Sequence, residues 1–236
     1  MERLVFVHGS VANGTATWSG QRELADRFEL EILNRPGFPP NPPAERSDFD
    51  DDARWVAELL RDGDHLVGNS YGGVISLLAA ARRPELVRSL TVIEPPATRL
   101  APDELAVRRF ADEGMDWWAR GPKDDPEAFL RGFLRTVGSN FDPPSPLPPE
   151  LEQGARALVV QRGPWEAEIG LETLAAASFP KLVVSGAHHA AFDAICDVLE
   201  RDLQAHRLVL PGFGHSVARH PDFNEHLAAF VESAGR

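Results

Sequence analysis

Short apolar runs alternate along this chain with longer segments that have the periodicity of helices. Most of these runs are continuous in Val, Leu, Ile or Phe, which is typical of strands buried on both faces of a sheet. Six strands are predicted, at residues 4–7, 29–33, 65–67, 89–93, 182–185 and 207–210, and only the second lacks the continuous pattern. Helices are predicted between them, at residues 17–27, 50–61, 71–82, 190–203 and 222–233. The alternation predicts an α/β fold with a mostly parallel sheet of about six strands flanked by helices.

The stretch from Pro95 to about Pro180 interrupts this alternation. It contains no convincing strand pattern. Four segments within it read as helices instead, at residues 103–118, 126–137, 151–161 and 166–177. We interpret the stretch as a helical insertion that follows the predicted strand at residues 89–93.

Composition excludes several classes of protein. The 236 residues suffice for one large domain or two small ones, and 36 acidic against 24 basic residues give a formal charge of −12. Without a basic face, nucleic acid and anionic membranes are poor partners. A single cysteine, Cys196, excludes an intrachain disulfide, so we expect a reducing cytoplasm. The apolar run near Met1 is too short for a signal peptide, and no run is long enough to span a membrane.

The sequence Gly-Asn-Ser-Tyr-Gly-Gly at residues 68–73 lies between a predicted strand and a predicted helix. A serine on such a sharp turn exposes its hydroxyl, and small residues two positions before and after it permit the close approach that the turn requires. Gly68 and Gly72 meet this requirement. Backbone N–H groups at the start of the helix would stabilise an anion beside the serine. Ser70 is therefore predicted to be a nucleophile, and the alternative is a simple helix cap.

A serine nucleophile needs a base. Among the eight histidines, His215 is the strongest candidate because it lies in the loop at residues 211–216, directly after the last predicted strand. The carboxyl ends of parallel strands meet at one edge, where Ser70 is also expected. His8 follows the first strand, and either shapes its loop or takes part in function. The remaining histidines outside the 188–189 pair are expected to be structural or surface residues: His65, His206, His220 and His226.

Two carboxylates compete for the third role, which is to orient the histidine. Glu94 directly ends the strand at residues 89–93 and precedes two prolines, so it lies at the predicted catalytic edge. Asp193 comes several residues after the strand at residues 182–185, in the predicted first turn of a helix. We favour Glu94 and keep Asp193 as the alternative acid.

The neighbouring His188 and His189 suggest a metal site, but adjacent residues on an extended loop point apart, and no acidic or cysteine cluster completes a ligand set. We therefore expect no metal. Cys196 has apolar neighbours and is expected to be a small buried residue rather than a catalytic thiol.

In their order, these landmarks resemble the α/β-hydrolase fold family over essentially the whole chain. The matching segments are residues 5–10 with Trp18, 34–38, 68–73, 94–96, 181–186 and 211–215. The resemblance implies that Ser70 is the nucleophile, that His215 is the base, and that the backbone N–H groups of Ser10 and Tyr71 form an oxyanion hole. It also implies a core domain of residues 1–96 and 179–236, with residues 97–178 as a helical cap over the site. On this alignment the chain begins at the family's third strand, so the sheet would be N-terminally trimmed.

Two departures from the family pattern affect the expected chemistry. The family's most frequent acid, an Asp shortly after the strand at residues 181–185, is replaced by His188 and His189. Some members, including certain haloalkane dehalogenases, carry the acid at the end of the preceding strand, as Glu94 would. A serine at position 70, where the dehalogenases and epoxide hydrolases have an aspartate, argues against both of those activities.

We therefore expect a cofactor-free serine hydrolase that acts on a small or medium apolar carboxylic ester, thioester or lactone. The alternatives are a carbon–carbon bond hydrolase, an enzyme similar to hydroxynitrile lyases or to cofactor-free haloperoxidases, and a ligand-binding sensor with little turnover. A cap lysine aimed at the site would favour cyanohydrin cleavage, but Lys123, the only lysine of the insertion, is expected to be exposed. The expected partner is a small-molecule substrate, and nothing in the sequence indicates a homo-oligomer.

Overall fold

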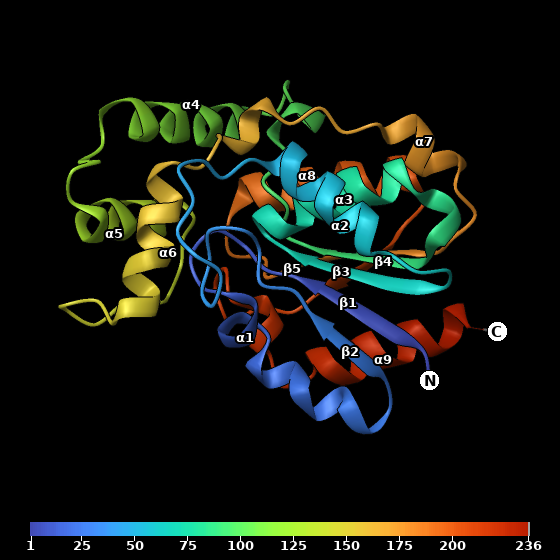
Figure 1. The fold of residues 1–236 in the computed structure, drawn as a ribbon. Coiled ribbons are helices and arrows are strands. Elements are labelled where there is room, and N and C mark those ends of the chain that lie inside the picture. Colours follow the sequence, from blue (N-terminus) through green and yellow to red (C-terminus); the bar gives the residue numbers. More distant parts are fainter. Residues whose placement is uncertain (236) are drawn as a thin grey trace.

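A single sheet of six parallel strands forms the centre of the molecule (Figure 1), whose computed structural model describes residues 1–235. The strand order is β2-β1-β3-β4-β5-β6, and each neighbouring pair is parallel. The strands are β1 (Arg3–Val7), β2 (Glu29–Ile32), β3 (Asp64–Asn69), β4 (Val87–Ile93), β5 (Lys181–Ser185) and β6 (His206–Val209). The predicted α/β fold and its six strands are thus confirmed.

Helices cover both faces of the sheet (Figure 1). One face carries α2 (Phe49–Leu59), α3 (Tyr71–Arg82) and α8 (Ala190–Leu203), and the other carries α9 (Phe223–Ala234). Alternate residues of β1 enter opposite cores, Val5 and Val7 on the side of α2 and α3, Leu4 and Phe6 on the side of α9. This burial on both faces explains why the central strands are continuously apolar.

Three local expectations are wrong. The helix expected at residues 17–27 is instead the short α1 (Gly14–Thr17) followed by a 3-10 helix, Ser19–Asp26, in a segment that contains the weak helix former Gly20. The helix expected at residues 166–177 shrinks to α7 (Leu171–Ala176), because Gly170 precedes it and disfavours a longer helix. Strand β6 is only partly buried, since it is the last strand of the sheet and has a neighbour on one side only.

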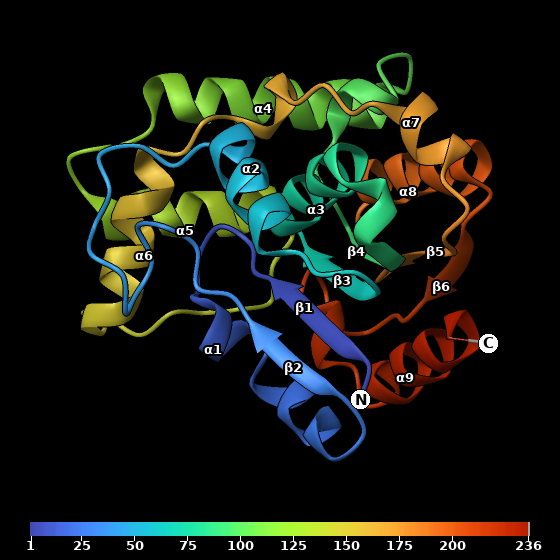
Figure 2. The same ribbon diagram turned by 45° about the vertical axis from the view of Figure 1, so that its right-hand side comes forward.

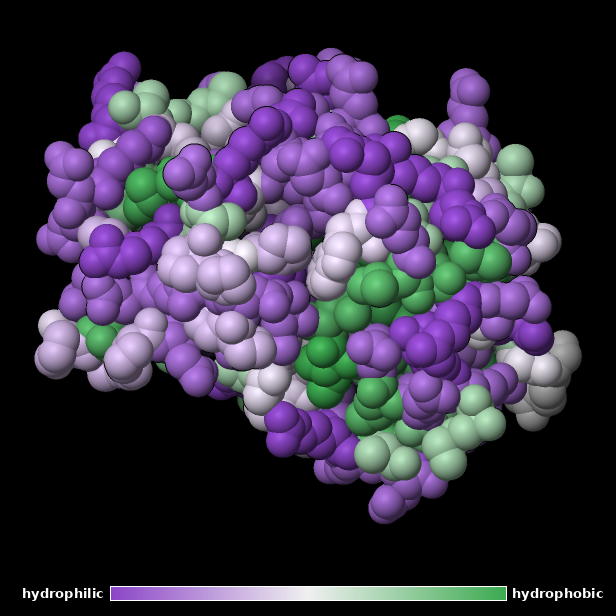
Figure 3. All heavy atoms as spheres, in the orientation of Figure 1, coloured by the Kyte–Doolittle hydropathy of each residue, from purple (hydrophilic) through white to green (hydrophobic). Residues whose placement is uncertain are grey.

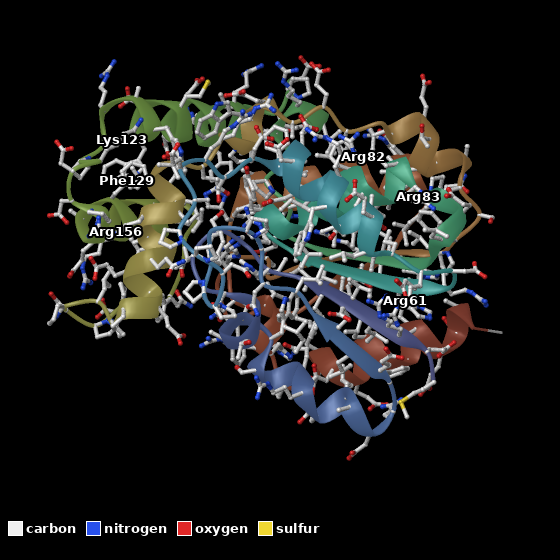
Figure 4. The ribbon with its side chains drawn as sticks, viewed as in Figure 1. Arg61, Arg82, Arg83, Lys123, Phe129 and Arg156 are labelled. Atoms are coloured by element: carbon white, nitrogen blue, oxygen red, sulfur yellow. The ribbon has the colours of Figure 1, made fainter. Side chains whose placement is uncertain are left out.

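The stretch between β4 and β5 is helical, with α4 (Leu105–Arg120), α5 (Pro126–Thr136) and α6 (Pro149–Val159) before α7. Figures 1 and 2 show α5 and α6 beyond the end of the sheet toward which β1 runs, which is the carboxyl end of the parallel strands. Phe129, labelled in Figure 4, belongs to a small apolar cluster that joins α5 to α6. Helices α5 and α6 thus share a small core and stand where the chemistry-bearing loops are expected, whereas buried residues of α4 and α7, such as Phe110 and Leu174, belong to the main core.

Hydrophilic residues dominate the face seen in Figure 3, as the net charge of −12 implies. A band of hydrophobic residues crosses this face in the region of β1 and β3. Within residues 1–235, no helix combines the length and the apolar character needed to cross a bilayer.

Candidate active site

Ser70 lies on a strained turn between β3 and α3. Its φ of 54° and ψ of −122° fall in a region that non-glycine residues rarely adopt, and such strain is concentrated at functional sites. A Cβ at Gly68 would collide with the Gly72 carbonyl, and one at Gly72 would collide with the Val7 carbonyl. The turn therefore needs glycine at both positions. The Ser70 N–H donates to the carbonyl oxygen of Ile93 at 2.8 Å, which fastens the turn to the end of β4.

Ser70, His215 and Glu94 form one continuous chain of hydrogen bonds. The Ser70 Oγ lies 2.9 Å from Nε2 of His215, and Nδ1 of the same ring lies 2.7 Å from Oε2 of Glu94. A proton on Nδ1, donated to the carboxylate, leaves the Nε2 lone pair free to accept from the serine hydroxyl. Asp193 has other partners: it accepts a hydrogen bond from Ser185 Oγ at 2.8 Å. The structure therefore brings together the first three residues and leaves Asp193 outside the group.

Glu94 is an ionised carboxylate inside the protein. Only 1% of the residue is exposed, and its φ of 44° turns the chain sharply after β4. Burial alone would raise the pKa of Glu94, but the close contact with His188 and the hydrogen bonds from His215 and the Gly186 N–H outweigh it and lower this pKa to about 2. The Gly186 N–H donates to Oε1 at 2.7 Å. The acid therefore stays charged at any pH near neutrality.

His188 is a second histidine against the same acid, a role that the sequence analysis missed. Its Nδ1 lies 3.1 Å from Oε1 of Glu94, too bent for a straight hydrogen bond, and its Nε2 lies 3.2 Å from the carbonyl oxygen of Val137 in the insertion. Burial lowers the pKa of His188, but Glu94 raises it more, so the net pKa lies above its usual value. The available signal was its position just after β5, where the resembled family most often has its acid.

Glu94, His188 and His215 each offer one ligand atom within 4.8 Å of one another, a spacing at which a metal ion could also bind. In the structure, the Nδ1 of His215 and the Oε2 of Glu94 are joined by a hydrogen bond of 2.7 Å. Such a short contact is typical of a charge-assisted hydrogen bond, which accounts for the cluster without an ion.

Two backbone N–H groups beside Ser70 are free to stabilise an oxyanion. Tyr71 follows the serine at the first position of α3, and Ser10 shares a cavity wall with Ser70. Neither N–H donates a hydrogen bond to another group in residues 1–235. The loop carrying Ser10 lies against Ser70, since a Cβ on Gly9 would lie 3.2 Å from the Ser70 Cβ.

His8 and Arg35 hold the loop after β1 in place through contacts with the Gly9 carbonyl. The Nδ1 of buried His8 lies 2.9 Å from the Gly9 carbonyl oxygen, while its Nε2 accepts the Arg35 N–H at 3.0 Å. Burial holds the pKa of His8 well below its usual value, so the ring is neutral. The fully buried Arg35 guanidinium donates to the Gly9 carbonyl at 2.7 Å and to Asp52 at 2.8 Å. His8 thus has a structural role, and no sequence pattern indicated the role of Arg35.

A cavity of about 350 Å³ opens beside Ser70 and His215. The loop after β1 forms one wall, and the insertion supplies apolar residues such as Phe133 and Leu151. Lys123 is exposed, and Figure 4 shows it at the outer turn between α4 and α5, away from the sheet. This position removes the lysine that cyanohydrin cleavage would use. Cys196 is also unsuited to catalysis, because burial raises the pKa of its thiol to about 12.

A parallel sheet with a strained serine at a strand-to-helix turn, linked to a histidine and a buried acid, defines the class of α/β proteins built around a Ser-His-acid group. The profile of the family described as alpha/beta hydrolase fold matches residues 2–144. This chain belongs to the α/β-hydrolase fold family.

Solved structures agree on the fold. MenH from S. aureus superposes with a TM-score of 0.77 at 16% identity, covering 100% of this chain and 95% of the other. A carboxylesterase from Bacillus subtilis, CesB, superposes with a TM-score of 0.67 at 18% identity, covering 98% and 83% of the two chains. At these identities the likeness shows the fold alone.

Curated relatives are similar over part of their length. The pimeloyl-[acyl-carrier protein] methyl ester esterase of Aeromonas salmonicida is 35% identical over 143 residues, which are 58% of this chain and 48% of the relative. The 2-(acetamidomethylene)succinate hydrolase of Mesorhizobium japonicum is 33% identical over 96 residues, 39% of this chain and 34% of the relative. The matched region thus spans less than half the length of these curated relatives.

Proposed function

We propose that this chain is a serine hydrolase that cleaves a small or medium apolar carboxylic ester, thioester or lactone through an acyl-enzyme on Ser70. The observation that carries the proposal is the unbroken hydrogen-bond chain from Ser70 Oγ through His215 to the ionised Glu94. Membership of the α/β-hydrolase family and similarity to esterases support it.

The proposed reaction has two steps. Ser70 Oγ attacks the acyl carbon while Nε2 of His215 takes the hydroxyl proton, and Glu94 stabilises the imidazolium that forms. The N–H groups of Ser10 and Tyr71 hold the oxyanion, and His215 then gives its proton to the leaving oxygen or sulfur. In the second step His215 removes a proton from water, which attacks the acyl-enzyme and releases the acid and free Ser70.

We also propose that residues 97–178 act as a cap that supplies most of the substrate pocket. The apolar side chains of α5 and α6 in the cavity wall support this division. The proposed substrate is a small molecule, and the single buried Cys196 supports a cytoplasmic location.

Labelling with a fluorophosphonate probe tests the proposal, because the probe reacts with activated serines. We expect the wild type to be labelled and Ser70→Ala and His215→Ala to remain unlabelled, with circular dichroism showing that both variants fold. Hydrolysis of p-nitrophenyl esters should disappear in the same variants. A folded wild type that takes up no label would contradict the proposal and favour a ligand-binding function instead.

A further inference from the structure

Two cavities of unequal size meet at Ser70. The wide one measures about 350 Å³, and a second, narrow one measures about 30 Å³. Both are lined by Ser10 and Ser70, so both reach the predicted reaction centre. A substrate held at Ser70 therefore has two directions in which to extend from its carbonyl carbon, one spacious and one confined.

The position of His215 tells the two directions apart. His215 lines the wide cavity. Within residues 1–235, it is not among the residues that line the narrow cavity. The imidazole that takes the serine proton must next donate it to the leaving atom, which must therefore lie within its hydrogen-bond reach. The leaving group then occupies the wide cavity, and the acyl group remains for the narrow one.

The narrow cavity limits the length of that acyl group. A single water needs roughly 10–15 Å³ of such space, so the cavity takes about two or three non-hydrogen atoms beyond the carbonyl carbon. Its walls include several aromatic side chains, among them Phe110, Trp118, Trp165 and Phe192. Phe192 also stacks on the His215 ring, with 4.5 Å between the ring centroids, so this part of the wall packs directly against His215.

One polar side chain of the narrow cavity is incompletely bonded. Gln161, which is 4% exposed, lines the cavity and donates through Nε2 to the Ser10 Oγ at 3.0 Å. Its Oε1 is buried and has no hydrogen-bond partner among residues 1–235. The Gln161 backbone is held in place, since its carbonyl oxygen accepts from Trp118 Nε1 at 2.8 Å. A buried acceptor without a hydrogen-bond partner is unfavourable, and a hydrogen-bond donor on the acyl group would provide that partner.

We propose that the substrate combines a short acyl group that carries a hydrogen-bond donor, such as a 2-hydroxyacyl group, with a bulky apolar leaving group, and that Gln161 determines the acyl preference. This inference rests on the proposed hydrolysis at Ser70. It differs from the arrangement named for the methyl ester esterases, in which the alcohol part is a single methyl group.

The assignment of the two cavities is tested with a pair of isomeric esters, octyl acetate and methyl nonanoate, which have the same composition. We expect kcat/KM for octyl acetate to exceed that for methyl nonanoate by about a hundredfold, because the long acyl chain of the second ester does not fit the narrow cavity. Equal values, or a preference for methyl nonanoate, would overturn the assignment.

The role of Gln161 is tested with octyl glycolate and octyl propionate, in which a hydroxyl replaces a methyl group. Changing Gln161→Leu should lower the glycolate-to-propionate ratio of kcat/KM roughly three- to tenfold, the effect of one lost hydrogen bond. A general loss of activity cancels in this ratio. Gln153→Leu is the matched control, since Gln153 donates to the Gly37 and Asn41 carbonyls outside both cavities, and it should leave the ratio unchanged.

An unchanged ratio in Gln161→Leu would refute the role of Gln161. Fluorophosphonate labelling of Ser70, run on the same samples, separates the two levels of failure. A labelled enzyme that ignores the acyl chain would refute only this inference, whereas an unlabelled and inactive wild type would refute the proposed hydrolysis as well.

Discussion

Replacing Glu94 by glutamine removes the charge of the proposed catalytic acid while keeping its size. Both carboxylate oxygens accept hydrogen bonds, Oε2 from His215 and Oε1 from the Gly186 N–H. A glutamine amide has one acceptor oxygen and one NH₂ group, so one of these two partners must face a donor. The side chain has the same shape, and the strand end that carries it, with a φ of 44°, need not move.

Each orientation of the amide has a different cost. With NH₂ toward His215, the ring must carry its proton on Nε2, and it can no longer accept the Ser70 proton. Loss of the correct tautomer costs about 10³- to 10⁴-fold in kcat, equivalent to about 4–5.5 kcal/mol of transition-state stabilisation. With NH₂ toward Gly186, two donors oppose each other in the interior, which costs about 1–3 kcal/mol of folding stability. The first orientation keeps an acceptor oxygen toward the Gly186 N–H and His188 and requires only a change of tautomer in His215, so we expect the loss to fall on kcat.

The assay is steady-state hydrolysis of p-nitrophenyl acetate by folded Glu94→Gln, with Asp193→Asn as the control. Asp193 accepts a hydrogen bond from Ser185 and has none with His215, so its variant should keep near-wild-type kcat. Substantial activity in Glu94→Gln, or an equal loss in Asp193→Asn, would refute the assignment of the acid.

Three further outcomes follow from buried contacts. Arg35→Met should lower the free energy of unfolding by about 3–5 kcal/mol in urea titrations, because it leaves Asp52 buried without its cation; a loss near zero would contradict this. Gly72→Ala should cost about 1–3 kcal/mol and slow labelling of the serine, since the new Cβ meets backbone oxygens of the loop after β1; an unchanged Tm would disagree. His188→Gln should reduce Tm most at low pH. The folded-state pKa of His188 is raised, so its stabilisation is complete below about pH 6.5 and disappears as pH rises through the folded pKa. A Tm difference that grows with pH would contradict that sign.

Sequence patterns predict best those elements whose residues are all buried in the same kind of apolar environment. Residues of β1, β3, β4 and β5 enter a core on each face of the sheet, so their continuous apolar pattern indicates burial directly. Strand β6 contains His206 and Arg207 beside two apolar residues and lies at the edge of the sheet, but its residues alone do not show which position in the strand order it takes. Helices α3 and α8 begin and end where predicted, because each directly follows a turn at the carboxyl edge.

The turn at Ser70 was predictable from the sequence for a local reason, whereas the residues that support it were not. The requirement for glycine at residues 68 and 72 arises from a few neighbouring atoms. In contrast, Gln161 meets Ser10 across 151 positions of the sequence, and Arg35 reaches Asp52 only after a loop folds back. Such contacts depend on how whole elements are placed relative to one another, and a single sequence contains no local pattern that predicts them.

The position of the acid at the end of β4 has structural consequences for the whole site. The Ser70 N–H donates to the carbonyl of Ile93 and the Glu94 N–H to that of Val184, so adjoining strand ends fix Ser70 and Glu94. Only His215 lies on a loop beyond the sheet. The place after β5 is thereby left to His188, whose ring lies between Glu94 and the carbonyl of Val137. His188 thus links the charge of Glu94 to the inserted helices through Val137, so a change in the protonation of His188 alters its contacts with both.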